Sequence, residues 1–216
     1  MMHLGPFLRP HFKRLQDEPN AGARGILFER QLITRLGSMG HCVLPTKTLS
    51  ATTAASLEVK VDCVNVFDKI SDLEAAEDSW TLYVPRSDSY PCDIISIPPD
   101  SDKTSPIYMW EASIVDPRDS KRVNDKLGWF PDEDASKNIP LGVLRQLREK
   151  FPDRRIVCIF CYSGDLTAGT SHTRFADLDT AAASAGRNAE MRVVDAQYMR
   201  SLGVLQSLFF ACLCAF

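Results

Sequence analysis

Residues 156–162 have the sequence IVCIFCY, an unbroken apolar run that limits the folds open to this chain. A strand without alternating polar positions has to be covered on both of its faces. Such strands lie in the interior of a sheet that has other elements packed above and below it. The run therefore predicts a central strand in a layered protein of helices and strands.

Two segments with helical periodicity predict covering helices. From Ala23 to Leu36, apolar residues recur at three- and four-residue spacing, and Gly37 is the predicted C-terminal cap. The second segment begins at Pro140, has one apolar face and ends before Pro152. An alanine-rich stretch at 176–185 predicts a third helix.

Shorter segments predict the other strands, at 41–49, 57–67, 80–85 and 191–195 and on both sides of the turn-rich loop 98–106. Polar and apolar residues alternate from Leu57 to Cys63, which indicates a half-buried strand. The order of elements is helix, several strands, helix, strand, helix, strand, helix. It predicts an α/β (α+β) protein with a mixed central sheet flanked by helices.

The chain of 216 residues has the size of one ordinary domain. We expect an irregular N-terminal arm at 1–20, a domain at 21–200 and an apolar C-terminal helix at 201–216. The C-terminal run is shorter than the 18 or more residues typical of a membrane span, so a membrane partner is not expected. A tail anchor, or a truncated or frame-shifted chain end, is the alternative for this run.

The net charge and the cysteines indicate which partners and which cellular compartment to expect for the protein. The net charge of −3 argues against a surface that binds nucleic acid everywhere, but allows a local basic groove. Seven cysteines, an odd number, lie mostly in apolar runs, which predicts reduced thiols in an intracellular, reducing compartment. Cys158 and Cys161 have the spacing of a redox or zinc half-site, but their apolar strand favours core packing.

Two acidic residues are the candidate functional pair. Asp93 lies in the segment 90–97, and Glu111 lies in the segment 107–115, and both segments are predicted to be strands. Neighbouring strands of a hairpin lie about 4.8 Å apart, so two carboxylates on them can share one Mg²⁺ ion. The pair therefore predicts metal-assisted cleavage of phosphodiesters.

The order of a helix with Glu29, a strand with Asp93, a hairpin to a strand with Glu111, then a helix and a strand resembles the core of the PD-(D/E)xK, or restriction-endonuclease-like, superfamily. The resemblance implies that Asp93 and Glu111 hold the metal and that Glu29 supports it. The lysine expected two residues after Glu111 is replaced by Ser113. Lys121, or Lys126, would then have to supply the charge beside the phosphate.

The stretch LYVPRSDSYPCD, residues 82–93, is similar to the "LYxPxSxxxPxxD" stretch of crinkler-type effectors, whose nuclease-like domains are related to those of retrotransposon-hot-spot-type proteins. The resemblance spans about 80–195. It implies a nuclease-like domain acting on nucleic acid, DNA rather than RNA, with Mg²⁺ and no small-molecule cofactor. Nuclear localisation, or the host cell for an effector, follows from the same resemblance.

Several alternatives remain open at this point. The loss of the lysine favours an inactive module that binds nucleic acid or a partner protein through the charged segment 116–134. Asp93 could serve only to bind main-chain amides, and Glu29 could be a surface ion-pair residue. Glu58 and Lys60 form a literal Glu-x-Lys on another strand, although their alternation suits an exposed sheet face.

Overall fold

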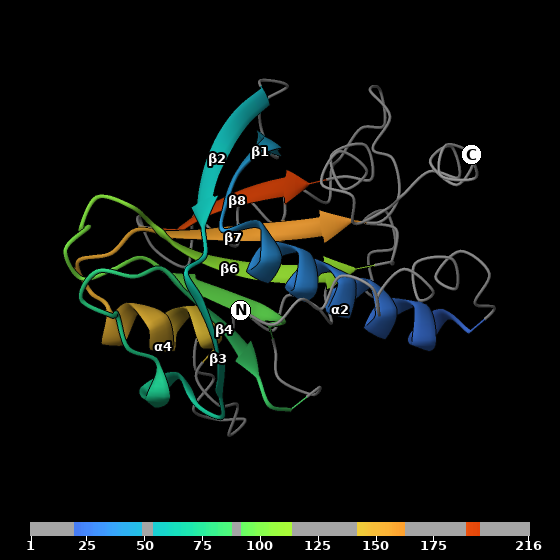
Figure 1. Cartoon of the computed structure of the whole chain (residues 1–216), viewed down its shortest axis with the longest axis horizontal. Coiled ribbons are helices and arrows are strands. Elements are labelled where there is room, and N and C mark those ends of the chain that lie inside the picture. Colours follow the sequence, from blue (N-terminus) through green and yellow to red (C-terminus); the bar gives the residue numbers. More distant parts are fainter. Residues whose placement is uncertain (1–19, 49–53, 88–91, 114–141, 163–188, 195–216) are drawn as a thin grey trace, which may run out of the picture.

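The computed structural model describes residues 20–48, 54–87, 92–113, 142–162 and 189–194, which form a mixed α/β arrangement (Figure 1). Its helices are α2 (Ala21–Met39), α4 (Val143–Lys150) and the 3-10 turn η1 (Ile70–Asp72). The strands are β1 (His41–Thr48), β2 (Ala54–Lys60), β3 (Cys63–Phe67), β4 (Thr81–Pro85), β5 (Ile94–Ile97), β6 (Ile107–Ser113), β7 (Ile156–Tyr162) and β8 (Ala189–Val194). The predicted mixed sheet flanked by helices is confirmed.

The strands are hydrogen-bonded in the order β2-β1-β8-β7-β6-β5-β4-β3. β5 runs antiparallel to β4 and β6, whereas β6, β7 and β8 are parallel to one another. The apolar run that starts at Ile156 is therefore an interior strand, as predicted, and its side chains from Ile156 to Cys161 are all buried. Side chains on one face of this strand pack with α2, and those on the other face pack with α4.

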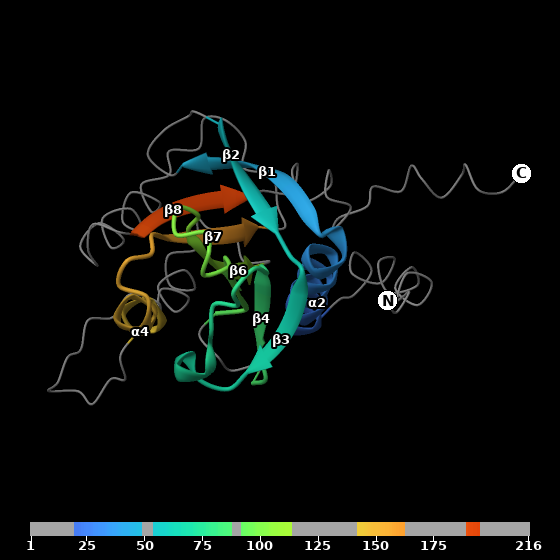
Figure 2. The ribbon, with the colours of Figure 1, turned by 60° about the vertical axis from the view of Figure 1, so that its left-hand side comes forward.

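Alternate side chains of β6 point to opposite faces of the sheet. Trp110 and Ala112 pack with Phe28 and Leu32 of α2, whereas Met109 packs with the buried side chains of α4. Figure 2 shows α2 and α4 on opposite sides of the sheet. We refer to these as the α2 face and the α4 face.

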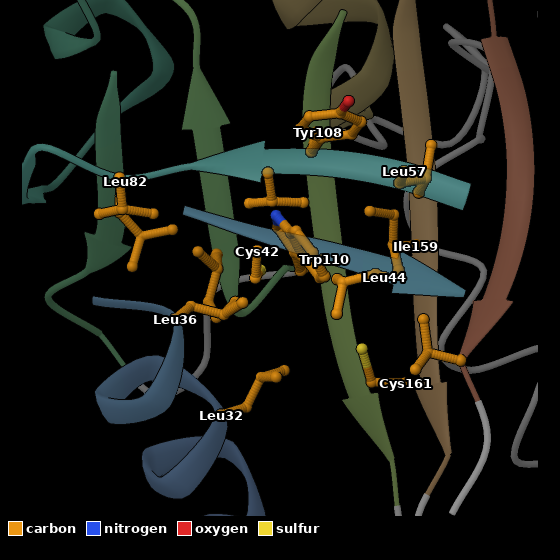
Figure 3. Close-up of a cluster of buried hydrophobic side chains, with 14 of the residues drawn as sticks. Leu32, Leu36, Cys42, Leu44, Leu57, Leu82, Tyr108, Trp110, Ile159 and Cys161 are labelled. Carbon is orange, nitrogen blue, oxygen red and sulfur yellow. The ribbon is translucent and has the colours of Figure 1, made fainter. Parts of the chain in front are cut away.

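The β1–β2 pair also covers the α2 face. In Figure 3 the two strands cross over β5, β6 and β7, with Leu44 lying near Trp110 and Leu57 near Ile159. The hydroxyl of Tyr108 on β6 donates to the main-chain carbonyl of Glu58 on β2 at 2.9 Å. The strongly twisted sheet thus folds back on one half of its own surface.

The predicted single strand 57–67 is wrong, because this segment is two strands. β2 and β3 lie at opposite ends of the strand order, and only Val61 and Asp62 join them. The main-chain amides of Asp62 and Cys63 both donate to the carbonyl of Trp80, at 2.9 and 3.2 Å, and the Asp62 carboxylate accepts from the Trp80 amide at 2.7 Å. The acidic residue therefore marks the point where the chain leaves one edge of the sheet and begins the other.

The predicted helix cap at Gly37 is also wrong, because α2 continues to Met39. The helix ends at Gly40, whose φ of 66° is in the left-handed region that glycine adopts without strain. Gly37 lies inside the helix, where a Cβ atom would approach Cγ2 of Val64 to 3.0 Å. The close packing of α2 on β3 explains this glycine.

The prediction that Cys158 and Cys161 are core residues is confirmed. Both are fully buried, and the five described cysteines are all free thiols. Residues three apart on a strand point to opposite faces, and Cys158 belongs to the α4 face whereas Cys161 belongs to the α2 face. The two sulfurs therefore cannot act together as a redox pair or a zinc half-site.

Several predictions lie outside the described residues: the N-terminal arm, the charged segment 116–134, the helix at 176–185 and the C-terminal run 201–216. Within the part of the chain that the structure describes, neither helix is long and apolar enough to cross a membrane.

Candidate functional site

Asp93 and Glu111 lie next to each other on the β5–β6 hairpin. Ile94, the first residue of β5, is the register partner of Trp110 on β6. Asp93 immediately precedes Ile94, and Glu111 immediately follows Trp110. Both acids therefore lie where β5 begins and β6 nears its end.

Asp93 contacts the main chain of β6 twice. Its amide donates to the carbonyl of Trp110 at 3.1 Å, and its carboxylate Oδ2 accepts from the amide of Ala112 at 2.5 Å. The second contact is a short, charge-assisted hydrogen bond. Binding of a main-chain amide, one of the two roles considered for Asp93 from sequence, is thus present in the structure, and it involves one carboxylate oxygen.

Glu111 is only 2% exposed although it is an acid within an apolar strand. By strand alternation it lies on the α4 face, beside its register partner Phe160 of β7. Ser113, two residues further on, follows on the same face and is also buried. Burial of a carboxylate is costly unless charge or hydrogen bonds compensate it, so this position requires a specific electrostatic environment.

The two carboxylates influence two neighbouring thiols. Burial, followed by the negative charges of Asp93 and Glu111, raises the pKa of the Cys92 thiol well above its usual value. The same causes, in the same order, raise the pKa of Cys161. Asp93 and Glu111 thus both lie within electrostatic reach of the same two thiols.

Glu29 is placed differently. It lies on α2, half-buried, and α2 covers the face of the sheet opposite to the one that Glu111 occupies. The structure therefore brings Asp93 and Glu111 together at the hairpin, whereas Glu29 belongs to a helix on the other face.

The rival pair Glu58 and Lys60 lies on the exposed face of β2. The Glu58 carboxylate is 2.8 Å from Nε2 of His41 and 3.3 Å from Nζ of Lys60. The hydrogen bond from His41, then that from Lys60, lowers the pKa of Glu58. These contacts are those of a solvent-exposed ion-pair cluster.

The far end of the hairpin is held by a buried arginine. Arg154 is 4% exposed and donates to the carbonyls of Pro99, at 2.8 Å, and Asp102. Within the loop, the Asp102 carboxylate accepts from the amides of Thr104 and Ser105, at 3.1 and 3.0 Å. The Ser105 hydroxyl, ahead of the other contacts, lowers the pKa of Asp102 to about 2.

The lysines proposed to act beside the phosphate, Lys121 and Lys126, lie outside the described residues. Among the residues that are described, no three His, Cys, Asp or Glu side chains are grouped to hold a metal ion. The described donor set at the hairpin is therefore two carboxylates.

Two neighbours of the pair, Cys92 and Cys161, were not associated with it from the sequence. The sequence could have indicated Cys92, because it is the residue before Asp93. Cys161 could not be found in this way, because it is the register partner of Ala112 and becomes a neighbour only when β6 and β7 pair.

Neither a protein-family model, nor a curated protein, nor a solved structure matches this chain.

Proposed function

We propose that the chain is a metal-dependent phosphodiesterase of the nuclease type, in which Asp93 and Glu111 hold the cation. The observation that carries the proposal is the placement of these two acids beside the paired residues Ile94 and Trp110 of adjacent strands. The burial of Glu111 adds support, because a structural acid would ordinarily be on the surface.

The order of elements supports a restriction-endonuclease-like arrangement. A helix, α2, precedes the antiparallel β5–β6 hairpin that carries the acids, and α4 then leads into β7, parallel to β6. This is the order that the resemblance to PD-(D/E)xK proteins implies. Membership of the nuclease-like domains of crinkler or retrotransposon-hot-spot-type proteins is part of the same proposal.

The donor set suits Mg²⁺ in chemical type. Mg²⁺ prefers oxygen ligands, and it is often bound by one or two carboxylates together with water and substrate phosphate. Asp93 and Glu111 provide such a pair. When bound, the cation would polarise the phosphate and lower the pKa of a coordinated water.

The chain's own residues have separate tasks in this proposal. Glu111 supplies a carboxylate from a buried position, where the low dielectric constant strengthens its attraction for a cation. Asp93 supplies the second carboxylate from the start of β5. Ser113 supplies a hydroxyl on the face of Glu111, which can hydrogen-bond but cannot neutralise charge on a phosphate as an ammonium would.

The direct test is cleavage of plasmid DNA by the purified chain in the presence of Mg²⁺. Asp93→Asn and Glu111→Gln are each expected to lower the cleavage rate roughly 100-fold or more, because each removes one of the two charged oxygen ligands that hold the cation. Asp102→Asn, in the loop of the same hairpin, is the matched control and should cleave at the wild-type rate. Cleavage that persists in both acid variants would exclude this mechanism.

A second candidate function rests on Ser113. With a serine where the superfamily pattern has lysine, the scaffold could bind nucleic acid or a partner protein without chemistry. In that case the wild type binds DNA in a gel-shift assay but neither cleaves it nor takes up Mg²⁺ in a calorimetric titration. Measurable Mg²⁺ uptake that Glu111→Gln abolishes would decide against this second candidate.

A further inference from the structure

Asp93 brackets Glu111 on the main chain of β6. Its amide donates to the carbonyl of Trp110, the residue before Glu111, and its Oδ2 accepts from the amide of Ala112, the residue after it. One residue thus fixes the main chain on both sides of the buried acid.

The strand pairing shows why the side chain is needed. In the register of Ile94 with Trp110, Cys92 would be the residue opposite Ala112. β5 begins only at Ile94, so Cys92 lies outside the strand. On the other side, Ala112 is paired with Cys161 of β7. The Asp93 carboxylate therefore accepts a hydrogen bond that the main chain of a longer β5 would have accepted.

We propose that Asp93 is a positioning residue for Glu111, its carboxylate replacing a main-chain carbonyl in the β5–β6 ladder. This inference deepens the proposed function and rests on it for the role of Glu111. It assigns Asp93 a task that is separate from any contact with a cation: to keep Glu111 in one register at the end of β6.

The positioning role and a pure ligand role predict different rankings of variants. Asp93→Asn keeps an oxygen acceptor for the Ala112 amide, whereas Asp93→Ala removes it. Asp93→Glu keeps the charge but moves it outward by one methylene, away from the position that accepts from Ala112. If Asp93 were only a ligand, Asp93→Glu would retain cation binding best, and none of the three variants would change the exchange of the Ala112 amide.

The experiment combines amide hydrogen exchange by NMR with titration of Mn²⁺ as the probe cation, on the full chain. We expect the Ala112 amide to exchange at least about tenfold faster in Asp93→Ala and Asp93→Glu than in the wild type. In Asp93→Asn its exchange should stay within about threefold of the wild type. Mn²⁺ affinity should fall in the order wild type, Asp93→Asn, Asp93→Ala.

Asp102→Ala is the matched control, because Asp102 also accepts from main-chain amides but in the loop of the hairpin. It should leave Ala112 exchange and Mn²⁺ affinity unchanged. Unaltered Ala112 exchange in Asp93→Glu overturns the positioning role, and so do equal Mn²⁺ affinities of Asp93→Asn and Asp93→Ala. If Asp93→Ala does not fold, the exchange rates of the Ala112 amide in Asp93→Asn and Asp93→Glu decide whether Asp93 positions the strand. If the wild type takes up no Mn²⁺, the proposed function fails, while the exchange data still decide whether Asp93 positions the strand.

Discussion

Gln31 is a polar residue on the buried side of α2. It is 6% exposed, and neither its amide nitrogen nor its amide oxygen has a hydrogen-bond partner among the residues that the structure describes. A buried polar group without a partner retains the cost of its lost hydration, about 1–3 kcal/mol. Gln31 lies among the apolar residues of α2 in the sequence, but only the packing shows that its amide has no partner among the described residues.

We therefore expect Gln31→Leu to stabilise the fold by about 1 kcal/mol, measured as the free energy of unfolding in urea. Arg30→Leu is the control. Arg30 is the exposed neighbour on the same helix, so its substitution tests the effect of adding a leucine without removing a buried amide. The control should change the unfolding free energy by less than about 0.5 kcal/mol. A loss of stability in Gln31→Leu would show that the amide has a partner that matters.

The buried thiols make stability depend on alkaline pH. Burial raises the pKa of Cys42 from 9.0 to about 11 and that of Cys158 from 9.0 to about 12. Below pH 9.0 both thiols are protonated in the folded and the unfolded chain, so their contribution to stability is complete. Above pH 9.0 the unfolded chain loses these protons first, which favours unfolding until the folded pKa is passed.

We expect the free energy of unfolding to fall between pH 9 and pH 11, as measured by urea denaturation at fixed ionic strength. The double variant Cys42→Ala/Cys158→Ala should show a shallower fall, because it lacks the two thiols. An identical slope in the double variant would assign the alkaline transition to other groups.

The β5–β6 hairpin is the element on which the site depends, and Arg154 fastens its loop. The guanidinium satisfies the carbonyls of Pro99 and Asp102 from a buried position and lies 3.7 Å from the Asp100 carboxylate. The loop is thereby tied to the turn between α4 and β7.

Replacing Arg154 by methionine keeps most of the aliphatic packing but leaves the two carbonyls without their donor. We expect a loss of about 3 kcal/mol in the free energy of unfolding, measured by urea denaturation. Arg155→Met tests the exposed neighbour and should cost less than about 1 kcal/mol. A small loss in Arg154→Met would mean that water replaces the guanidinium without cost.

Elements whose pattern is local could be predicted from the sequence. The apolar run at β7 and the amphipathic pattern of α4 both predicted the right element, because burial on two faces gives a continuous apolar run and burial on one side of a helix gives a helical periodicity. The acid pair was predicted on adjacent strands, and Glu111 does lie on β6, whereas Asp93 lies directly before the first residue of β5. The break between β2 and β3 was missed, since alternation continues to Val61 and only the contacts of Asp62 with Trp80 show that the strand has ended. The end of α2 was missed because Gly37 and Gly40 carry the same local signal, and packing against Val64 distinguishes them.

At the scale of the whole molecule, the eight described strands form a sheet whose two outermost members are consecutive in the chain. The corner at Asp62 links these two strands, and its hydrogen bonds to Trp80 hold it against β4. The α2 face is enclosed between α2, the β1–β2 pair and the rest of the sheet (Figures 2 and 3).

Asp62→Ala should therefore lower the free energy of unfolding by about 1–2 kcal/mol, because the Trp80 amide loses its acceptor. Asp62→Asn keeps an oxygen at that place and should recover most of the loss. Asp78→Ala, two residues before Trp80 and exposed, is the control and should be nearly neutral. Equal stability of Asp62→Ala and Asp78→Ala would show that the corner is held by the main chain alone.

The direct link from β2 to β3 also bears on how the chain reaches its native state. Both borders of the sheet are synthesised between residues 54 and 67, before β4 to β8 exist. The last described strand, β8, pairs with β1 on one side and β7 on the other, so it has to enter between strands that are made earlier. Pairings this distant in sequence are slow to form. On the ribosome, the enclosed apolar face would thus remain incomplete until the residues of β8 have emerged.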